Sequence, residues 1–286
     1  FTSSNCQIYV VDNMSKDESY AKLLEEYQED ETITLIQAPS NGGYSAGNNI
    51  GIKKAIEDDK DVVFIVNSDV ELLNDAFTIM TNTLLSDTRY MMVGPSVIDN
   101  NGEEGQLPRK KLTFGVFVMA RHPFCDIPFF ARKANRQYDI SNETIATFEG
   151  STSGCCFGMT AEDFKKIDYF DDNVFLYSEE DILAYKMSAL QKLSVVNMDA
   201  KVWHKENIST KKEGSAFVQF HRWTSVFYML KTYAGISKSK QLFISLWNIL
   251  TWTGLSIFSQ PHRKMLKDFN KRNIEILKTD YRNGVM

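Results

Sequence analysis

Short apolar segments alternate with amphipathic segments over the first hundred residues, and this alternation constrains the fold more than any other feature of the chain. The candidate strands are 8–11, 32–37, 61–66 and 91–97, and the candidate helices between them are 15–27, 45–57 and 76–85. Helices of this length between strands are typical of right-handed crossovers that join parallel strands. The alternation therefore predicts an α/β fold with a mostly parallel sheet.

The chain is predicted to have two parts. Residues 1–210 carry the strand and helix pattern and form the α/β domain, whereas 211–286 carry helical patterns and form a helical C-terminal extension. The chain opens on its 8–11 strand without an initiator methionine, so we expect that a first strand and helix are missing from it. Residues 100–150 are weakly patterned, with basic and aromatic side chains, and are the segment expected to set substrate specificity.

An acidic turn follows the most apolar of the predicted strands. Val62–Val66 is continuously apolar, as in a strand buried on both faces, and Asn67, Ser68 and Asp69 come directly after it. In open α/β sheets, ligands bind at the carboxyl ends of the strands. Magnesium and manganese ions typically take one or two carboxylates together with substrate phosphates. Asp69 is therefore a candidate metal ligand, although a solvated turn would explain the same residues taken alone.

Two downstream features favour the metal interpretation. Three consecutive acids, Glu179, Glu180 and Asp181, open a predicted helix, and His204 ends a second apolar segment. A carboxylate here can serve as general base, and a neutral imidazole is a ligand for manganese-like ions. The alternatives are structural, because Ser178 and Asp181 have capping-box spacing and a strand-end histidine is often only a packing residue.

Composition narrows the class of protein. The net charge of −5 argues against a general nucleic-acid binder, which would be basic. The four cysteines lack the paired spacing of a zinc site, and two of them are adjacent, which suits a structural disulfide poorly. We therefore expect a reduced chain in the cytoplasm.

Six short motifs occur along the chain in a fixed order. They are Val-Val-Asp-Asn, Asn-x-Gly-Tyr-x-x-x-Asn, Asn-Ser-Asp-Val-Glu-Leu, Gly-x-x-Phe-x-Met, Phe-Asp-x-x-x-Phe-Leu-Tyr-x-Glu-Glu-Asp and Val-Trp-His. Together they span roughly residues 8–210 and resemble family 2 glycosyltransferases of the GT-A fold, most closely the bacterial rhamnosyl- and galactofuranosyltransferase branch. Two departures stand out: the family's first strand is missing, and its Asp-x-Asp motif here begins with Asn67.

The resemblance implies a role for each motif. Glu180 aligns with the catalytic base and Glu179 lies beside it, at the acceptor, while Asp69 and His204 would hold a Mg²⁺ or Mn²⁺ ion. The implied donor-binding residues are Asp12, Asn41, Gly42, Asn48 and Asn67. A turn-forming Asp-Asn pair and a plain glycine turn remain alternatives for Asp12 and Gly42.

The implied function is inverting transfer of a sugar from a UDP- or dTDP-linked donor to a hydroxyl of a cell-surface glycan or a lipid-linked acceptor. Two other classes stay open at this point. One is a sugar-phosphate nucleotidyltransferase, which uses a similar sheet and metal. The other is a non-catalytic module that binds nucleotide sugars or glycans.

The segment 242–258 is apolar but carries several polar side chains, among them Ser245 and Asn248, which argue against a membrane span. Two tryptophans and flanking lysines and arginines suit a helix lying in the interface of an anionic membrane, with contact through 238–267. A helix packed on the catalytic domain or in a homodimer explains the same residues, and the sequence does not separate these alternatives.

Overall fold

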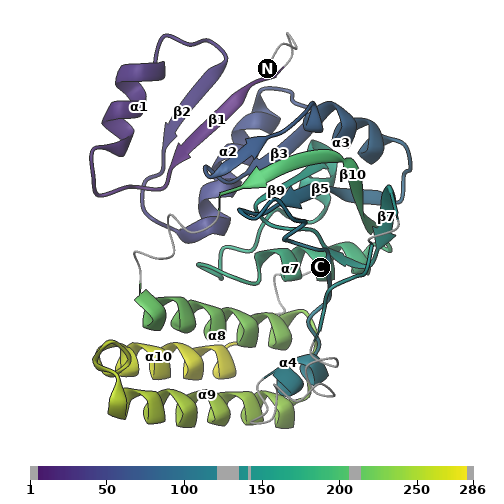
Figure 1. The fold of residues 1–286 in the computed structure, drawn as a ribbon. Helices are drawn as coiled ribbons and strands as arrows, with labels where there is room; N and C mark the ends of the chain where they lie inside the picture. The colour runs from purple at the N-terminus through teal and green to yellow at the C-terminus, as the bar shows by residue number, and fades with distance from the viewer. Residues whose placement is uncertain (1–5, 121–134, 141–142, 206–213, 282–286) are drawn as a thin grey trace.

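The computed structural model describes residues 6–120, 135–140, 143–205 and 214–281 (Figure 1). In the first half of the chain the elements are β1 (Ile8–Asp12), α1 (Ser19–Tyr27), β2 (Ile33–Gln37), α2 (Gly43–Glu57), β3 (Val62–Val66), β4 (Val70–Leu72), α3 (Ala76–Leu85), β5 (Tyr90–Ile98), β6 (Arg109–Lys110) and α4 (Phe114–Ala120). The second half contains β7 (Ile145–Phe148), β8 (Gly150–Ser151), β9 (Cys156–Thr160), α6 (Ala161–Lys166), α7 (Glu179–Ala189), β10 (Leu193–His204), α8 (Gly214–Thr232), α9 (Lys238–Phe258) and α10 (Gln260–Lys278). The predicted α/β fold is confirmed.

The central sheet has the strand order β3-β9-β5-β10-β4, with β7 also paired to β10. Its strands β3, β5 and β10 run in one direction, and β9 lies antiparallel between β3 and β5. Strand β10 runs without a break from Leu193 to His204. Its ladder with β5 shifts register between Asn197 and Lys201, and this bulge interrupts the apolar pattern.

Strands β1 and β2 pair in parallel as a two-stranded sheet, and α1 connects them (Figure 1). Asp12 is the last residue of β1 and Gln37 the last of β2, so both side chains stand at the same edge. The helix after β2, α2, then returns the chain to β3 in the central sheet.

Helices cover both faces of the central sheet, which is why its strands read as continuous apolar runs. On one face, Ile52 of α2, Phe164 of α6 and Leu183 of α7 pack with β3, β5 and β9. On the opposite face, Met80 and Leu84 of α3 pack with β5 and β10. The carboxyl ends of the strands are thereby left as the place where polar side chains can gather.

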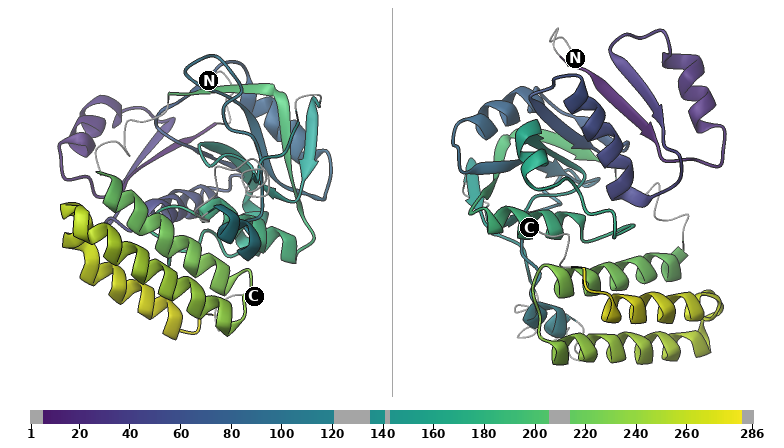
Figure 2. Two further views of the ribbon diagram at one scale, coloured as in Figure 1. Left: turned by 60° about the horizontal axis from the view of Figure 1, so that its bottom comes forward. Right: turned by 180° about the vertical axis from the view of Figure 1, so that it is seen from behind.

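Helices α8, α9 and α10 lie side by side below the α/β part, with α9 farthest from the sheet (Figures 1 and 2). They join it through a shared apolar core, in which Phe227 and Leu230 of α8 meet Val174 and Ile182. The Tyr228 and Tyr233 hydroxyls also donate hydrogen bonds to Asp171, at 2.6 and 2.7 Å. The division at residue 210 stays a prediction.

Candidate active site

A cavity of about 220 Å³ opens at the carboxyl ends of β3 and β10, against the first turn of α7. It is lined by Tyr44, Asn67, Gln106, Arg109, Ser151, Thr152, Ser153, Gly154, Cys155, Leu176, Tyr177, Glu179, Glu180, Asp181 and His204. These residues come from widely separated parts of the chain. The cavity therefore exists only in the folded protein.

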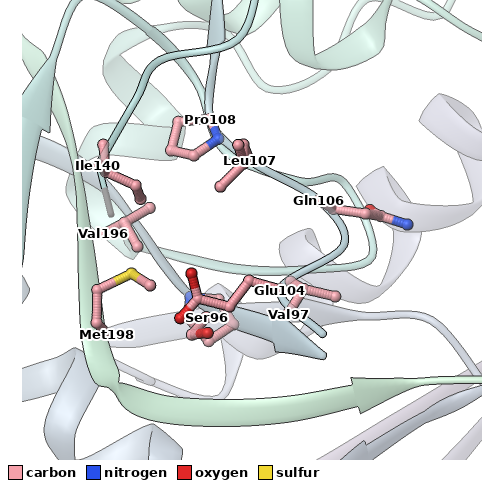
Figure 3. Close-up of a pocket in the computed structure, with 10 residues that line it drawn as sticks. Ser96, Val97, Glu104, Gln106, Leu107, Pro108, Ile140, Val196 and Met198 are labelled. Atoms are coloured by element: carbon pink, nitrogen blue, oxygen red, sulfur yellow. The ribbon is translucent and has the colours of Figure 1, made fainter. Parts of the chain in front are cut away.

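A second, much smaller pocket lies between β5, β10 and the segment before β6 (Figure 3). Leu107, Ile140, Val196 and Met198 surround it, and its volume of about 10 Å³ is no larger than a water molecule needs. Gln106 points away from this apolar group in Figure 3. The small pocket is a packing gap, and the larger cavity is the candidate site.

Asp69 and His204 meet at the edge of the large cavity. The Asp69 Oδ1 and His204 Nε2 atoms are 3.2 Å apart, and both side chains are mostly buried. On the other side of the ring, His204 Nδ1 lies 2.9 Å from Gln106 Nε2. Gln106 Oε1 in turn accepts a hydrogen bond from the Ser153 hydroxyl. A chain of polar groups thus fixes the orientation of the imidazole.

The pairing of β4 with β10 explains how residues so far apart in sequence come together. Val70 lies opposite His204 in this antiparallel ladder, and the Lys205 N–H donates to the Asp69 carbonyl at 2.9 Å. At the end of β3, the Asn67 N–H donates to the Cys155 carbonyl at 2.8 Å. The turn that carries Asp69 is therefore held from both sides by backbone hydrogen bonds.

The backbone before α7 differs from the predicted capping box. Tyr177 and Ser178 both have left-handed backbone conformations, with φ of 71° and 70°. A capping serine is normally extended, so the prediction that Ser178 caps this helix was wrong. Two successive non-glycine residues in this region are strained, and such strain is common at functional sites. Here it turns the first residues of α7 toward the cavity.

The three acids of α7 have different surroundings. The Asp181 carboxylate forms two hydrogen bonds with the Arg136 guanidinium, one of them Nη1 to Oδ2 at 3.2 Å. Glu179 is 5% exposed, whereas Glu180 is more accessible from the cavity. All three acids line the cavity, but Glu180 is the most exposed of them and has no ion pair among the contacts described.

Burial raises the pKa of both glutamates, and the charge of a neighbouring acid strengthens the effect on each, Glu180 acting on Glu179 and Asp181 acting on Glu180. Desolvation and the neighbouring Glu180 charge raise the pKa of Glu179. Desolvation also raises the pKa of Glu180, while Arg109 and Arg136 oppose that rise. The site therefore contains carboxyl groups that exchange protons nearer to neutral pH than a solvated glutamate does.

Close packing holds the Glu180 carboxylate in place. A Cβ atom added to Gly154 would lie 1.8 Å from Glu180 Oε1, so the carboxylate rests directly on this glycine. The Tyr44 hydroxyl donates to the Gly154 carbonyl at 2.8 Å. Gly43, whose φ is +84°, approaches the Phe175 backbone so closely that a Cβ would lie 2.1 Å from the Phe175 carbonyl oxygen. The start of α2 is thereby packed against the segment that leads into α7.

The family model for glycosyl transferase family 2 matches residues 2–168, more than half of the chain. The chain belongs to glycosyl transferase family 2. The match includes Asp69 but ends before Glu179, Glu180 and His204, so the roles of these three rest on geometry. The rhamnosyl- and galactofuranosyltransferase branch stays a prediction.

Two comparisons add to the family assignment. The chain is 23% identical over 188 residues to the low-salt glycan biosynthesis hexosyltransferase Agl10 of Haloferax volcanii, covering 64% of this chain and 54% of that protein. It thus spans about half the length of this curated relative. The fold is similar to that of GalNAc-T7 with UDP, GalNAc and Mn²⁺, with a TM-score of 0.56 at 13% identity, covering 95% of this chain and 49% of that one. The predicted GT-A fold is confirmed.

The predicted donor-binding residues of this family 2 member divide into two groups. Asn67 lines the cavity, whereas Asp12, Asn41, Gly42 and Asn48 are not among the described residues that line it. Asp12 accepts from the Ser15 N–H and from Gln37 Nε2, and Asn41 Oδ1 accepts from the Gly43 N–H. Asn48 Nδ2 donates to the Tyr44 carbonyl. These bonds give Asp12, Asn41 and Asn48 structural roles, and the part of all the predicted residues in donor binding stays a prediction.

Metal-ligating side chains are few at the site. Within residues 6–120, 135–140, 143–205 and 214–281, no group of three or more His, Cys, Asp or Glu side chains has the geometry to hold a metal ion. Asp69 and His204 form a pair, one hard oxygen and one imidazole nitrogen. A pair fits a cation that takes its remaining ligands from phosphate and water.

Sequence reasoning missed three residues of the site. Gln106 orients His204, Arg136 binds Asp181, and Arg109 lies at the exposed rim of the cavity. All three lie in the weakly patterned segment 100–150. Its basic residues around Arg109 were a visible signal, but neither Gln106 nor Arg136 belongs to a motif. Their contacts depend on the tertiary fold.

Proposed function

We propose that this chain catalyses inverting transfer of a hexose or deoxyhexose from a nucleotide-diphosphate donor to a hydroxyl of a glycan or lipid-linked acceptor. The observation that carries the proposal is the arrangement of one cavity. Its lining includes His204, in contact with Asp69, and also Glu180, a carboxylate of raised pKa with access to solvent. The reaction needs one group that neutralises the charge of the leaving diphosphate and another that accepts the proton of the attacking hydroxyl.

A divalent cation fits the Asp69 and His204 pair. With Gln106 Nε2 as donor to Nδ1, the Nε2 atom of His204 carries its hydrogen and faces Asp69. A half-turn of the Gln106 amide exchanges its donor and acceptor, after which Nδ1–H donates and Nε2 offers a lone pair to a metal. When bound, such a cation would neutralise charge on the departing diphosphate.

Glu180 is the proposed general base. Its carboxylate would take the proton of the acceptor hydroxyl as that oxygen bonds to the anomeric carbon. The bond from the anomeric carbon to the diphosphate oxygen breaks, and its electron pair leaves with the nucleotide diphosphate. Attack from the face opposite the leaving group inverts the anomeric configuration. Glu179, buried next to Glu180, would hydrogen-bond to the acceptor, and its raised pKa favours the neutral form beside the Glu180 carboxylate.

Arg109 and Asn67 complete the proposed site. Arg109 is exposed at the rim, and its positive charge acts on Glu180 and Asp181. Asn67 would bind a donor hydroxyl through its amide. A carboxylate in place of this amide would compete for the cation. The free thiols of Cys6, Cys155 and Cys156 support a reducing compartment, and an acceptor carried on a lipid would then place the reaction at the inner face of the plasma membrane.

Calorimetric titration of UDP and dTDP, each with and without Mn²⁺, tests the nucleotide site. We expect metal-dependent binding that weakens by more than about tenfold in Asp69→Ala. Glu71→Ala is the matched control, because this carboxylate lies two residues away and is exposed in an ion pair with Lys205. Binding that is absent with Mn²⁺, or equally weakened by both variants, would contradict the proposal.

The general base is tested separately. Glu180→Gln should bind the nucleotide like the wild type but release UDP or dTDP from a panel of sugar nucleotides about 10²- to 10⁴-fold more slowly in the presence of acceptor. Loss of binding together with turnover would assign Glu180 to the donor instead.

A further inference from the structure

The buried face of helix α9 is rich in polar side chains, and its exposed face is rich in apolar ones. Its buried residues include Gln241, Ser245, Asn248 and Ser256, whereas Leu242, Leu246, Leu250, Ile257 and Phe258 are exposed. Surface helices of globular proteins normally show the reverse arrangement. This reversal indicates that the outer face of α9 meets an apolar partner rather than water alone.

Hydrogen bonds fix the helix in this orientation. Asn273 of α10, which is fully buried, donates to the Ser245 hydroxyl at 2.8 Å and accepts from Asn248 Nδ2 at 3.2 Å. Trp252 Nε1 donates to the His262 carbonyl at 3.1 Å. Rotation of α9 to bury its leucines would break this network and expose Trp252. The outward apolar face is therefore a fixed feature of the fold.

The exposed apolar residues form one continuous stripe. Leu242, Leu246 and Leu250 are four residues apart, and Ile257 follows seven residues later, so they lie on the same side of the helix. Leu250 is 72% exposed, Ile257 61% and Phe258 91%. Scattered exposed leucines are ordinary, but a contiguous stripe marks an interaction surface.

The charged residues near the stripe are mostly positive, and the first acid that follows it in the sequence is Asp268. Residues 214–267 contain no aspartate or glutamate, although the whole chain has a net charge of −5. Lys238 and Lys240 lie at the start of α9, Lys264 and Lys267 follow its end, and all four are exposed. An apolar stripe between clusters of lysines is complementary to the acyl chains and anionic headgroups of a membrane.

We propose that the stripe of α9 lies in the interface of an anionic lipid bilayer, with the helix parallel to the membrane plane. By length and composition α9 could cross a bilayer, but its inner face is packed on α10 through buried polar groups. A second copy of the chain is a poorer fit, because pairing two such faces brings two sets of lysines together. Figures 1 and 2 show that α9 is the helix farthest from the sheet.

The membrane face is linked to the catalytic cavity by a short segment. Helix α4 rests on α9, where the Phe114 and Phe243 rings are 6.1 Å apart and Lys240 Nζ lies 5.0 Å from the Phe114 ring centre. Arg109, at the rim of the cavity, is five residues before Phe114. If the proposed function holds, this arrangement suits an acceptor carried on a lipid. The membrane contact itself does not depend on that function.

Vesicle flotation with the purified chain tests the proposal without any sugar donor. The wild type should float with vesicles of phosphatidylcholine and phosphatidylglycerol, and bind about tenfold more weakly to phosphatidylcholine alone or when Lys238, Lys240, Lys264 and Lys267 are all changed to Gln. The triple variant Leu246→Gln/Leu250→Gln/Ile257→Gln should lose most of its binding. Its substitutions are on exposed positions, so the fold is retained, as circular dichroism can verify.

The matched control is Leu73→Gln/Leu85→Gln/Leu190→Gln, which alters equally exposed leucines on the α/β part. It should float like the wild type. Absence of wild-type flotation with anionic vesicles, or equal loss in both triple variants, would overturn the proposal. So would a dimer in light scattering that dissociates in the α9 variant, since the stripe would then be a protein interface.

Discussion

Replacing Gly154 by alanine should disable the proposed base while leaving the fold intact. The new methyl group would meet the Glu180 carboxylate at 1.8 Å from Oε1 and 2.7 Å from Cδ. Gly154 is not one of the described glycines that have a positive φ, so its backbone accepts alanine without strain. The clash is with the end of a flexible side chain, which can swing away. The substitution therefore acts on the position of one carboxylate.

The size of the effect follows from this distance. To reach an ordinary contact of 3.4 Å, Oε1 has to move by about 1.6 Å. A misplacement of about 1 Å in a reacting group costs on the order of 10²-fold in rate. We therefore expect kcat to fall about 100-fold, which corresponds to about 2.7 kcal/mol in the activation free energy.

The assay is release of nucleotide diphosphate from a panel of UDP- and dTDP-sugars, with thermal unfolding and nucleotide titration on the same sample. Tm and nucleotide affinity should match the wild type, and only turnover should fall. Gly254→Ala is the control, because a Cβ there meets nothing within 4 Å among the described residues. Normal turnover in Gly154→Ala, with the variant folded, would refute Glu180 as the base.

Three further predictions concern the charged groups. Because burial raises the pKa of Glu179 above its unfolded value of 4.5, folding favours the protonated form, so stability present at low pH is lost as pH rises through the folded pKa. Glu179→Gln should remove this loss and raise Tm at about pH 8, and an unchanged Tm–pH profile would contradict it. Arg136→Met leaves the Asp181 charge buried without its partner and should lower the free energy of unfolding in urea by about 3–5 kcal/mol. Most of this loss should be recovered in the double variant Arg136→Met/Asp181→Leu. A double variant as unstable as the single one would count against the ion pair. Lys231→Met removes three hydrogen bonds to carbonyls at or just after the end of α10, including Thr279 at 2.6 Å, and should cost about 2–3 kcal/mol by the same measurement. An unchanged free energy of unfolding would show that these bonds do not stabilise the fold.

Much of the catalytic fold could be predicted from the chain alone. The strand and helix pattern of the first hundred residues predicted an α/β fold, because periodicity and crossover length are local properties. The acidic turn after Val62–Val66 was expected at the edge where ligands bind, and Asp69 is found there beside His204. That meeting depends on the antiparallel β4–β10 ladder, which the sequence pattern did not predict.

Local patterns failed where two interpretations shared the same residues. Ser178 and Asp181 have capping-box spacing, yet Ser178 is left-handed and Asp181 is bound to Arg136. The packing of the 168–178 segment against α2 imposes that backbone, and no sequence window contains both partners. The same holds for Gln106, whose role depends on a histidine almost a hundred residues away.

The sequence by itself determined which segments are strands and helices, and which strand ends carry acids, because hydrophobic periodicity and turn chemistry act over a few residues. Only the tertiary structure decided which of the three adjacent acids is held in an ion pair, which stays most exposed in the cavity, and which face of α9 turns outward. Those outcomes depend on long-range partners, Arg136 for Asp181 and Asn273 for Ser245 and Asn248. Buried polar groups must find hydrogen bonds wherever the fold supplies them, and here that requirement overrides the usual preference for burying leucine.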